Sequence, residues 1–198
     1  MLKRIAVAGL LLAAVASSAG AVPLTYVAQG VVDNSGTPGV AIGDSFTLTF
    51  TVETSTPNSC GLCGVGTYLG SVTGASFSVG TYTGGTGAAW DIHVEDTNLG
   101  DLFRISGGPS AVAGSIGGGP STSFHLSLYS ASGLGITTGS VLAVPTDVTL
   151  FSDTNFLFAG NDPMGHITSI QLVPEPSLLA LLGAGVLALA LRRRSSAT

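Results

Sequence analysis

The sequence predicts an all-β fold, an antiparallel β-sandwich of jelly-roll type, and three observations lead to it. Apolar and polar residues alternate in short stretches, a period of two that is typical of half-buried strands. Turn residues separate these stretches at intervals of roughly ten residues. Residues 22–172 contain no useful length of sequence with the 3.6-residue period of a helix. A stretch of this length, about 150 residues, can build one domain with its own core.

Each predicted strand rests on its own pattern. The clearest is 44–53, DSFTLTFTVE, which places four apolar side chains on one face: Phe46, Leu48, Phe50 and Val52. Residues 97–101 are expected to turn between two strands and make a hairpin. The other predicted strands are residues 24–32, 75–83, 90–96, 102–106, 123–129, 156–159 and 166–173.

Glycine clusters interrupt the strands and leave one alternative architecture open. The chain has 29 glycines, and clusters of them stand at residues 84–87, 107–108 and 117–119, without a fixed repeat period. A β-solenoid is therefore the second choice. The clusters lack the strand-to-helix setting and the lysine of a phosphate-binding loop, so we expect surface loops.

The charge balance of residues 22–172 excludes one class of partner. Ten of the eleven acidic residues lie in this region, but Arg104 is its only lysine or arginine. The resulting net charge of −9 repels phosphate backbones, so we expect no nucleic-acid binding. An acidic surface of this kind would suit a divalent cation such as Ca²⁺; otherwise no cofactor is expected.

The first 21 residues have the pattern of a secretory signal peptide. Lys3 and Arg4 precede an apolar segment at 5–16, and small residues follow at 17–21. Cleavage after Ala21 would leave residues 22–172 as an exported domain, with cleavage after Ala19 as the alternative. A second anchor helix, left uncleaved, is the other interpretation.

The last 26 residues, 173–198, form a separate segment with three parts. Pro174 and Pro176 exclude a helix interior at 173–177. Residues 178–191 are only Leu, Ala, Gly and Val, which predicts a transmembrane helix, although about 21 Å of helix is short for a hydrocarbon core of about 30 Å. Residues 192–198 begin with Arg192, Arg193 and Arg194, which would stop the helix at the cytoplasmic side. Basic residues near both ends of the chain place both ends in the cytoplasm and the domain outside.

These three parts together resemble the PEP-CTERM sorting tail of Gram-negative bacteria, a tail also called the ice-binding protein C-terminal domain without being evidence of ice binding. The resemblance implies an exosortase partner that recognises Pro174, Glu175 and Pro176 and cuts near them. It implies a precursor anchored in the inner membrane with a periplasmic domain, which then moves to the cell surface or an exopolysaccharide matrix. The order of sequence features in residues 22–172 also resembles that of a loosely defined set of PEP-CTERM ectodomains, and this resemblance carries no active-site residues with it.

Two cysteines, Cys60 and Cys63, lie between predicted strands among Pro and Gly. A redox CxxC motif opens a helix, and a zinc site needs about four ligands, so neither fits this setting. We expect a disulfide that closes a small loop in an exported protein.

The most suggestive polar cluster is at 91–96. Strand alternation places Asp91, His93 and Glu95 on one face, where they are weak candidates for a metal site. Residues 96–101 begin like a calcium loop, but Asp101 stands where the loop needs glycine. A solvated strand face is the simpler interpretation, and so we assign no metal ligands and no catalytic residues.

The sequence therefore favours a non-enzymatic protein of the cell surface or the biofilm matrix. The first alternative is a carbohydrate-binding module that uses aromatic side chains, namely Tyr26, Tyr68, Tyr82, Trp90 or Tyr129. The second is a secreted hydrolase that uses Asp91, Glu95 or Asp101.

Overall fold

The computed structural model describes residues 23–60, 65–86, 89–97, 99–107, 112–113, 115–116, 119–120, 123–133, 136, 142–159, 164–174 and 184–185. The predicted signal peptide, residues 1–21, lies outside them. All the predicted strand regions contain strands, but their borders differ. The main strands are β1 (Leu24–Asn34), β2 (Ser45–Val52), β3 (Val65–Val79), β5 (Trp90–Thr97), β6 (Gly100–Gly107), β10 (Ser123–Ser130), β11 (Asp153–Ala159) and β12 (Met164–Leu172).

The described residues also form shorter elements. They are β4 (Tyr82–Thr86), β7 (Val112–Ala113), β8 (Ser115–Ile116), β9 (Gly119–Pro120) and the 3₁₀ turn η1 (Val148–Leu150). The predicted strand 75–83 is divided between β3 and β4, because the chain turns at Gly80 with a positive φ of 53°. The first half of β3 was not predicted, since its glycines and polar residues hide the alternation.

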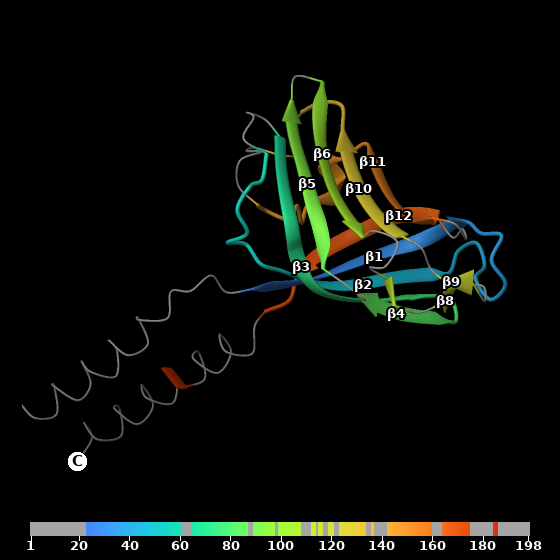
Figure 1. Cartoon of the computed structure of the whole chain (residues 1–198). Coiled ribbons are helices and arrows are strands. Elements are labelled where there is room, and N and C mark those ends of the chain that lie inside the picture. The colour runs from blue at the N-terminus through green and yellow to red at the C-terminus, as the bar shows by residue number, and fades with distance from the viewer. Residues whose placement is uncertain are drawn as a thin grey trace, which may run out of the picture.

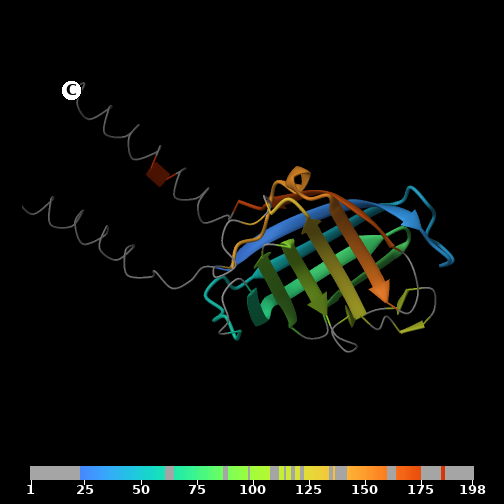
Figure 2. The same ribbon diagram turned by 90° about the horizontal axis from the view of Figure 1, so that it is seen from above.

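The eight main strands close into an antiparallel barrel, so the predicted sandwich of two sheets is wrong. Neighbours follow the order β2, β1, β12, β11, β10, β6, β5, β3, and β3 pairs again with β2. Alternation looks the same in a sandwich and in a barrel, because both have one buried face per strand. Figure 2 shows β5, β6, β10 and β11 crossing in front of β1 and β2.

Strand β3 closes the barrel because it bends. Its first part pairs with β5 and its second part with β2, with an irregular register between Tyr68 and Val72. The bend is at Gly70, which has a φ of 67°, a conformation that favours glycine. The backbone N–H of Gly70 donates a hydrogen bond to Asp91 Oδ1 on β5 at 2.7 Å. A side chain of the neighbouring strand thus holds the bend in place.

Aromatic side chains fill the interior of the barrel. Phe46 stacks on Phe156 with ring centroids 4.1 Å apart, and Trp90 stacks on Phe124 at 5.1 Å. Phe158 joins Phe124 at 5.0 Å. Leu142, Val144 and Phe151, beyond β10, also belong to this buried core. In a barrel of eight strands, side chains packed in this way can fill the interior as a core.

The first and last strands lie side by side. Tyr26 of β1 pairs with Leu172 of β12, and the N–H of Val173 donates to the carbonyl of Thr25 at 2.8 Å. The start of β1 and the end of β12 therefore meet at the same end of the barrel (Figure 1). Pairing continues to the residue before Pro174.

Candidate functional site

The side chains of the predicted cluster on β5 make hydrogen bonds to other residues of the protein. Asp91, His93 and Glu95 share the outer face, as alternation predicts, but each already has a partner. Asp91 holds the N–H of Gly70, as described above. His93 Nε2 lies 2.7 Å from Glu95 Oε1, and His93 Nδ1 lies 3.1 Å from Thr67 Oγ1. Both ring nitrogens are thus occupied, and the described residues contain no group of three or more His, Cys, Asp or Glu side chains placed to hold a metal ion.

Asp101 lies on the other side of the sheet. The β5–β6 connection is a tight hairpin in which Thr97 pairs with Gly100. The predicted hairpin is confirmed, but its turn is shorter than 97–101, and residues 100–107 form β6 and not the rest of a calcium loop. Asp101 is 0% exposed, and its Oδ2 accepts a hydrogen bond from the N–H of Ile136 at 2.8 Å. It shares the inward face of β6 with Phe103, whereas Asp91 and Glu95 face outward. The proposed hydrolase carboxylates therefore do not form one site.

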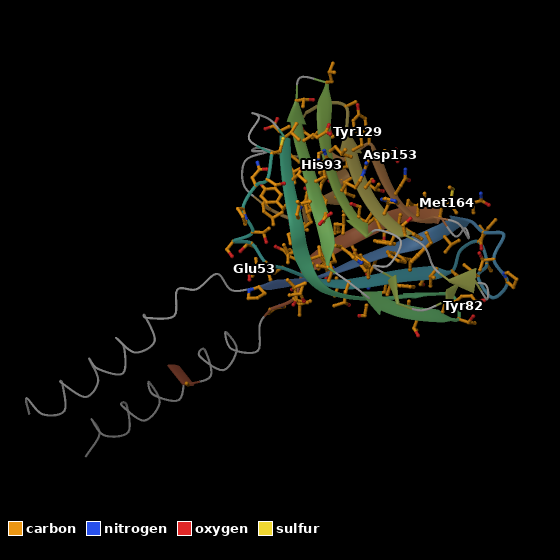
Figure 3. All side chains as sticks on the ribbon, in the orientation of Figure 1. Glu53, Tyr82, His93, Tyr129, Asp153 and Met164 are labelled. Carbon is orange, nitrogen blue, oxygen red and sulfur yellow. The ribbon has the colours of Figure 1, made fainter. Side chains whose placement is uncertain are left out.

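Most of the aromatic residues considered for sugar binding are buried. Tyr26, Tyr68 and Trp90 belong to the core, and burial raises the pKa of both tyrosines. Tyr82 packs against the core, and its hydroxyl donates to the carbonyl of Pro38 at 2.6 Å. Tyr129 is 39% exposed. Figure 3 shows Tyr129 near Asp153, away from Tyr82 beside β4.

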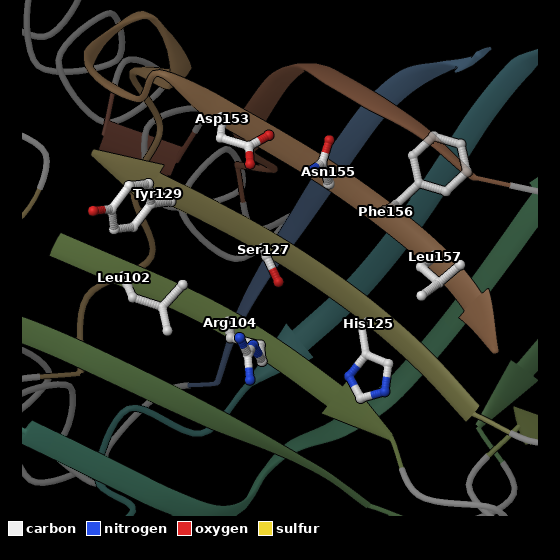
Figure 4. Close-up of a pocket in the computed structure, with 9 residues that line it drawn as sticks. All are labelled: Leu102, Arg104, His125, Ser127, Tyr129, Asp153, Asn155, Phe156 and Leu157. Atoms are coloured by element: carbon white, nitrogen blue, oxygen red, sulfur yellow. The ribbon is translucent and has the colours of Figure 1, made fainter. Parts of the chain in front are cut away.

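Tyr129 borders a groove over the outer face of β6, β10 and β11. Its volume is about 560 Å³, and the close-up in Figure 4 shows its side chains. The lining residues are Leu102, Arg104, His125, Ser127, Tyr129, Asp153, Asn155, Phe156 and Leu157. A groove of this size lies within the range of about 300–1,000 Å³ that is usual for ligand sites.

Strand register arranges the groove in rows. Ser127 of β10 pairs with Arg104 on one side and with Asn155 on the other, which gives a central polar row. Tyr129 pairs with Leu102 and with Asp153 in the row on one side. His125 pairs with Leu157 in the row on the other side. The groove thus has a polar centre with an aromatic ring and a carboxylate at one end.

Two basic side chains face the groove from neighbouring strands. Burial, and to a smaller extent the charge of Arg104, lowers the pKa of His125. His125 is therefore neutral at pH 7, and Arg104 carries the positive charge of the groove. The ion pairs of the described residues join His93 to Glu95 and His166 to Asp33, so neither involves Arg104.

Arg104, Ser127 and Asn155 were not predicted as site residues from the sequence. One signal was available, because Arg104 is the only lysine or arginine of residues 22–172. Ser127 and Asn155 had no signal, since their meeting depends on the pairing of β10 with strands distant in sequence.

The C-terminal candidate residues are only partly described. Pro174 lies two residues after Leu172, the end of β12, whereas Glu175, Pro176 and Arg192–Arg194 lie outside the described residues. Of the predicted helix at 178–191, Ala184 and Gly185 are described, and they are helical. No helix within the described ranges is long and apolar enough to cross a membrane. Cys60 is half-buried and Cys63 is outside the description, so the disulfide stays a prediction.

Comparison with known proteins identifies the C-terminal segment. Residues 172–194 match the family model of the PEP-CTERM protein-sorting motif, which confirms the resemblance seen in the sequence. No curated protein and no solved structure matches the chain. The match begins at Leu172, the last residue of β12, so the motif follows the barrel without a linker. The chain carries the sorting motif of PEP-CTERM proteins, the exported proteins that an exosortase sorts.

Proposed function

We propose that this chain is a non-enzymatic protein of the cell surface or the extracellular matrix, delivered there by an exosortase. The observation that carries the proposal is the sorting motif at 172–194, directly behind a closed barrel. On this proposal the precursor is anchored in the inner membrane with its barrel in the periplasm. Exopolysaccharide is the partner expected after processing.

The junction between barrel and motif suits this role. The last backbone hydrogen bond of the barrel in this region is donated by Val173 to Thr25. Removal of residues after Pro174 would therefore leave every pairing of β12 in place. A processed protein would keep all the described strands of the barrel, because β12 ends at Leu172, before the proposed cut.

Non-enzymatic action is supported by how the acidic side chains of the predicted sites are used. Asp91 holds the backbone of β3, Glu95 pairs with His93, and Asp101 faces inward. Hydrolysis of a glycosidic bond needs two carboxyl groups about 5–10 Å apart that face the same substrate. These three carboxylates do not have that arrangement.

The intact mass of the protein from membrane, surface and medium fractions tests the proposal, with and without the exosortase. We expect a product that ends near residues 174–177 in the normal strain and a full-length tail in the strain without exosortase. Full-length tails in both strains would contradict sorting. Retention of the processed form in the cytoplasmic membrane would contradict the surface location.

A second candidate function, carbohydrate binding, is favoured by the groove over β6, β10 and β11. An exposed tyrosine beside hydrogen-bonding side chains is a usual arrangement for sugar recognition, because sugars present both apolar faces and hydroxyl groups. A glycan array probed with the full chain tests this candidate. Binding that Tyr129→Ala removes would support it, and no binding to any glycan would contradict it.

A further inference from the structure

We propose that the groove over β6, β10 and β11 binds an oligosaccharide with a carboxylate group, such as one with a uronic acid unit, and that Arg104 holds the carboxylate. The inference rests on the carbohydrate-binding candidate and names its ligand class. It begins from the position of the single positive charge.

Arg104 is exposed on the outer face of β6, at one end of the central polar row. Its direct neighbours across the sheet are His93 on β5 and Ser127 on β10, and neither is acidic. Ten acidic residues lie in residues 22–172, yet Arg104 forms none of the ion pairs in the described part of the chain. Its guanidinium group is therefore available to bind a carboxylate through two parallel hydrogen bonds.

The rest of the row supplies partners for neutral sugar groups. Ser127 and Asn155 lie beside Arg104 in strand order, and their side chains have no hydrogen bond to another described residue. A hydroxyl and an amide can each donate and accept, as sugar hydroxyls require. Asp153, in the neighbouring row, adds an acceptor at the far side of the groove from Arg104.

The tyrosine at the end of the groove is held in position. Its hydroxyl donates a hydrogen bond to the carbonyl of Leu99 at 3.2 Å, so the ring keeps one orientation. The apolar side chains of Leu102 and Leu157 complete the walls. A fixed ring of this kind can cover the apolar face of a sugar whose hydroxyls point into the polar row.

The overall charge limits the number of carboxylates on the ligand. Residues 22–172 have a net charge of −9, which repels a long polyanion. At physiological salt this repulsion decays over about 8 Å, so one carboxylate in contact with Arg104 is affected least. We therefore expect recognition of a short segment with one acidic sugar.

The test compares two trisaccharides by calorimetry with the full chain in detergent. One contains a single glucuronic acid residue, and the other is its carboxyl-reduced form with glucose in that place. We expect the acidic form to bind at least about tenfold more tightly. Arg104→Gln should remove this preference, and Arg104→Lys should restore part of it, because lysine keeps the charge but not the planar fork.

Thr83→Glu on β4 is the matched control. It lowers the net charge by one, as Arg104→Gln does, on an exposed residue that does not line the groove. This variant should keep the preference for the acidic form. Loss of the preference in both variants would indicate a general charge effect and contradict the inference.

Two further outcomes separate this inference from the function on which it rests. Equal binding of both trisaccharides, unchanged by Arg104→Gln, would overturn the role of Arg104 and leave carbohydrate binding standing. No binding of either trisaccharide, or of any glycan on the array, would overturn both.

Discussion

Two neighbouring outer faces of the barrel contain similar polar residues but use them differently. The face of β5 has Asp91, His93 and Glu95, and all three make hydrogen bonds inside the protein. On the adjacent strand, Arg104 pairs in register with His93, yet it faces a groove whose polar side chains Ser127 and Asn155 are unbonded within the described structure. The difference shows that residue type alone does not mark a site. A candidate site is distinguished by polar side chains whose hydrogen-bonding groups are not already bonded to other residues of the protein.

The largest expected effect comes from the interior beneath both faces. Trp90→Ala should lower the free energy of unfolding by about 3–5 kcal/mol, because the indole is 0% exposed and stacks on Phe124. Urea denaturation followed by circular dichroism measures the change. Trp90→Phe keeps a ring at the position and should lose less.

The same variants test the idea that Trp90 is a sugar-binding residue. If Trp90→Ala kept its stability but lost binding of a glycan, the indole would have to be accessible, and the distinction between core and groove would be wrong.

A substitution on the outer face of β5, where the polar side chains are already hydrogen-bonded, should cause a smaller loss of stability. Asp91→Ala removes the acceptor of the Gly70 N–H at the bend of β3, and should cost about 1–3 kcal/mol of unfolding free energy. Asp91→Asn keeps an oxygen at the position and should recover most of that loss. Binding of the acidic trisaccharide should be unchanged in Asp91→Asn, since Asp91 does not line the groove. An Asp91→Ala variant as stable as the wild type would show that this face is not structural.

The sequence predicted the all-β class of the fold. It did not predict that the strands close into a barrel. Alternation located β2 almost to the residue, because Phe46, Leu48, Phe50 and Val52 are all buried on one face. The sheet closes into a barrel because β3 pairs with β5 before the bend at Gly70 and with β2 after it. A single glycine does not show in the sequence that a strand bends there, and the residue that holds it, Asp91, is 21 positions away.

The candidate sites show the same contrast: a site made of contiguous residues was predicted, and a site made of distant residues was not. The sorting motif was recognised from the sequence because its parts are contiguous in the chain. The groove combines residues of β6, β10 and β11, and only their pairing brings Arg104, Ser127 and Asn155 into a row. Asp91, His93 and Glu95 were identified as a cluster correctly, but their hydrogen bonds to Gly70 and Thr67 could not be read from spacing.

The open groove predicts variants that lose binding without losing stability. Asn155→Ala and Ser127→Ala should each change the free energy of unfolding by no more than about 0.5 kcal/mol, because neither side chain has a described intramolecular partner to lose. Each should weaken binding of the acidic trisaccharide, by about five- to tenfold for one lost hydrogen bond. Thermal unfolding and calorimetry on the same samples separate the two quantities. A clear loss of stability in both variants would show that Ser127 and Asn155 stabilise the fold, as the polar side chains of β5 do, and would contradict an open binding groove.

The smallest effect is the dependence of stability on pH through His125. Burial, and then the charge of Arg104, lowers the pKa of His125 in the folded protein below its ordinary value of 6.5. Between these two pKa values the unfolded chain binds more protons than the folded one, so stability falls as the pH drops below 6.5. The loss ends once the pH is below the folded pKa.

His125→Gln should therefore show a shallower decline of stability from pH 7.5 to pH 5 than the wild type. His125 pairs with Ser106 on β6 and with Leu157 on β11, and the charge that acts on it is that of Arg104. None of these neighbours is acidic, so the sign of the effect holds. All other titrating residues are common to both proteins and cancel in the difference between their urea denaturation curves. Parallel curves over this range would mean that His125 is solvated in the folded state, and the groove would then be more open than its geometry implies.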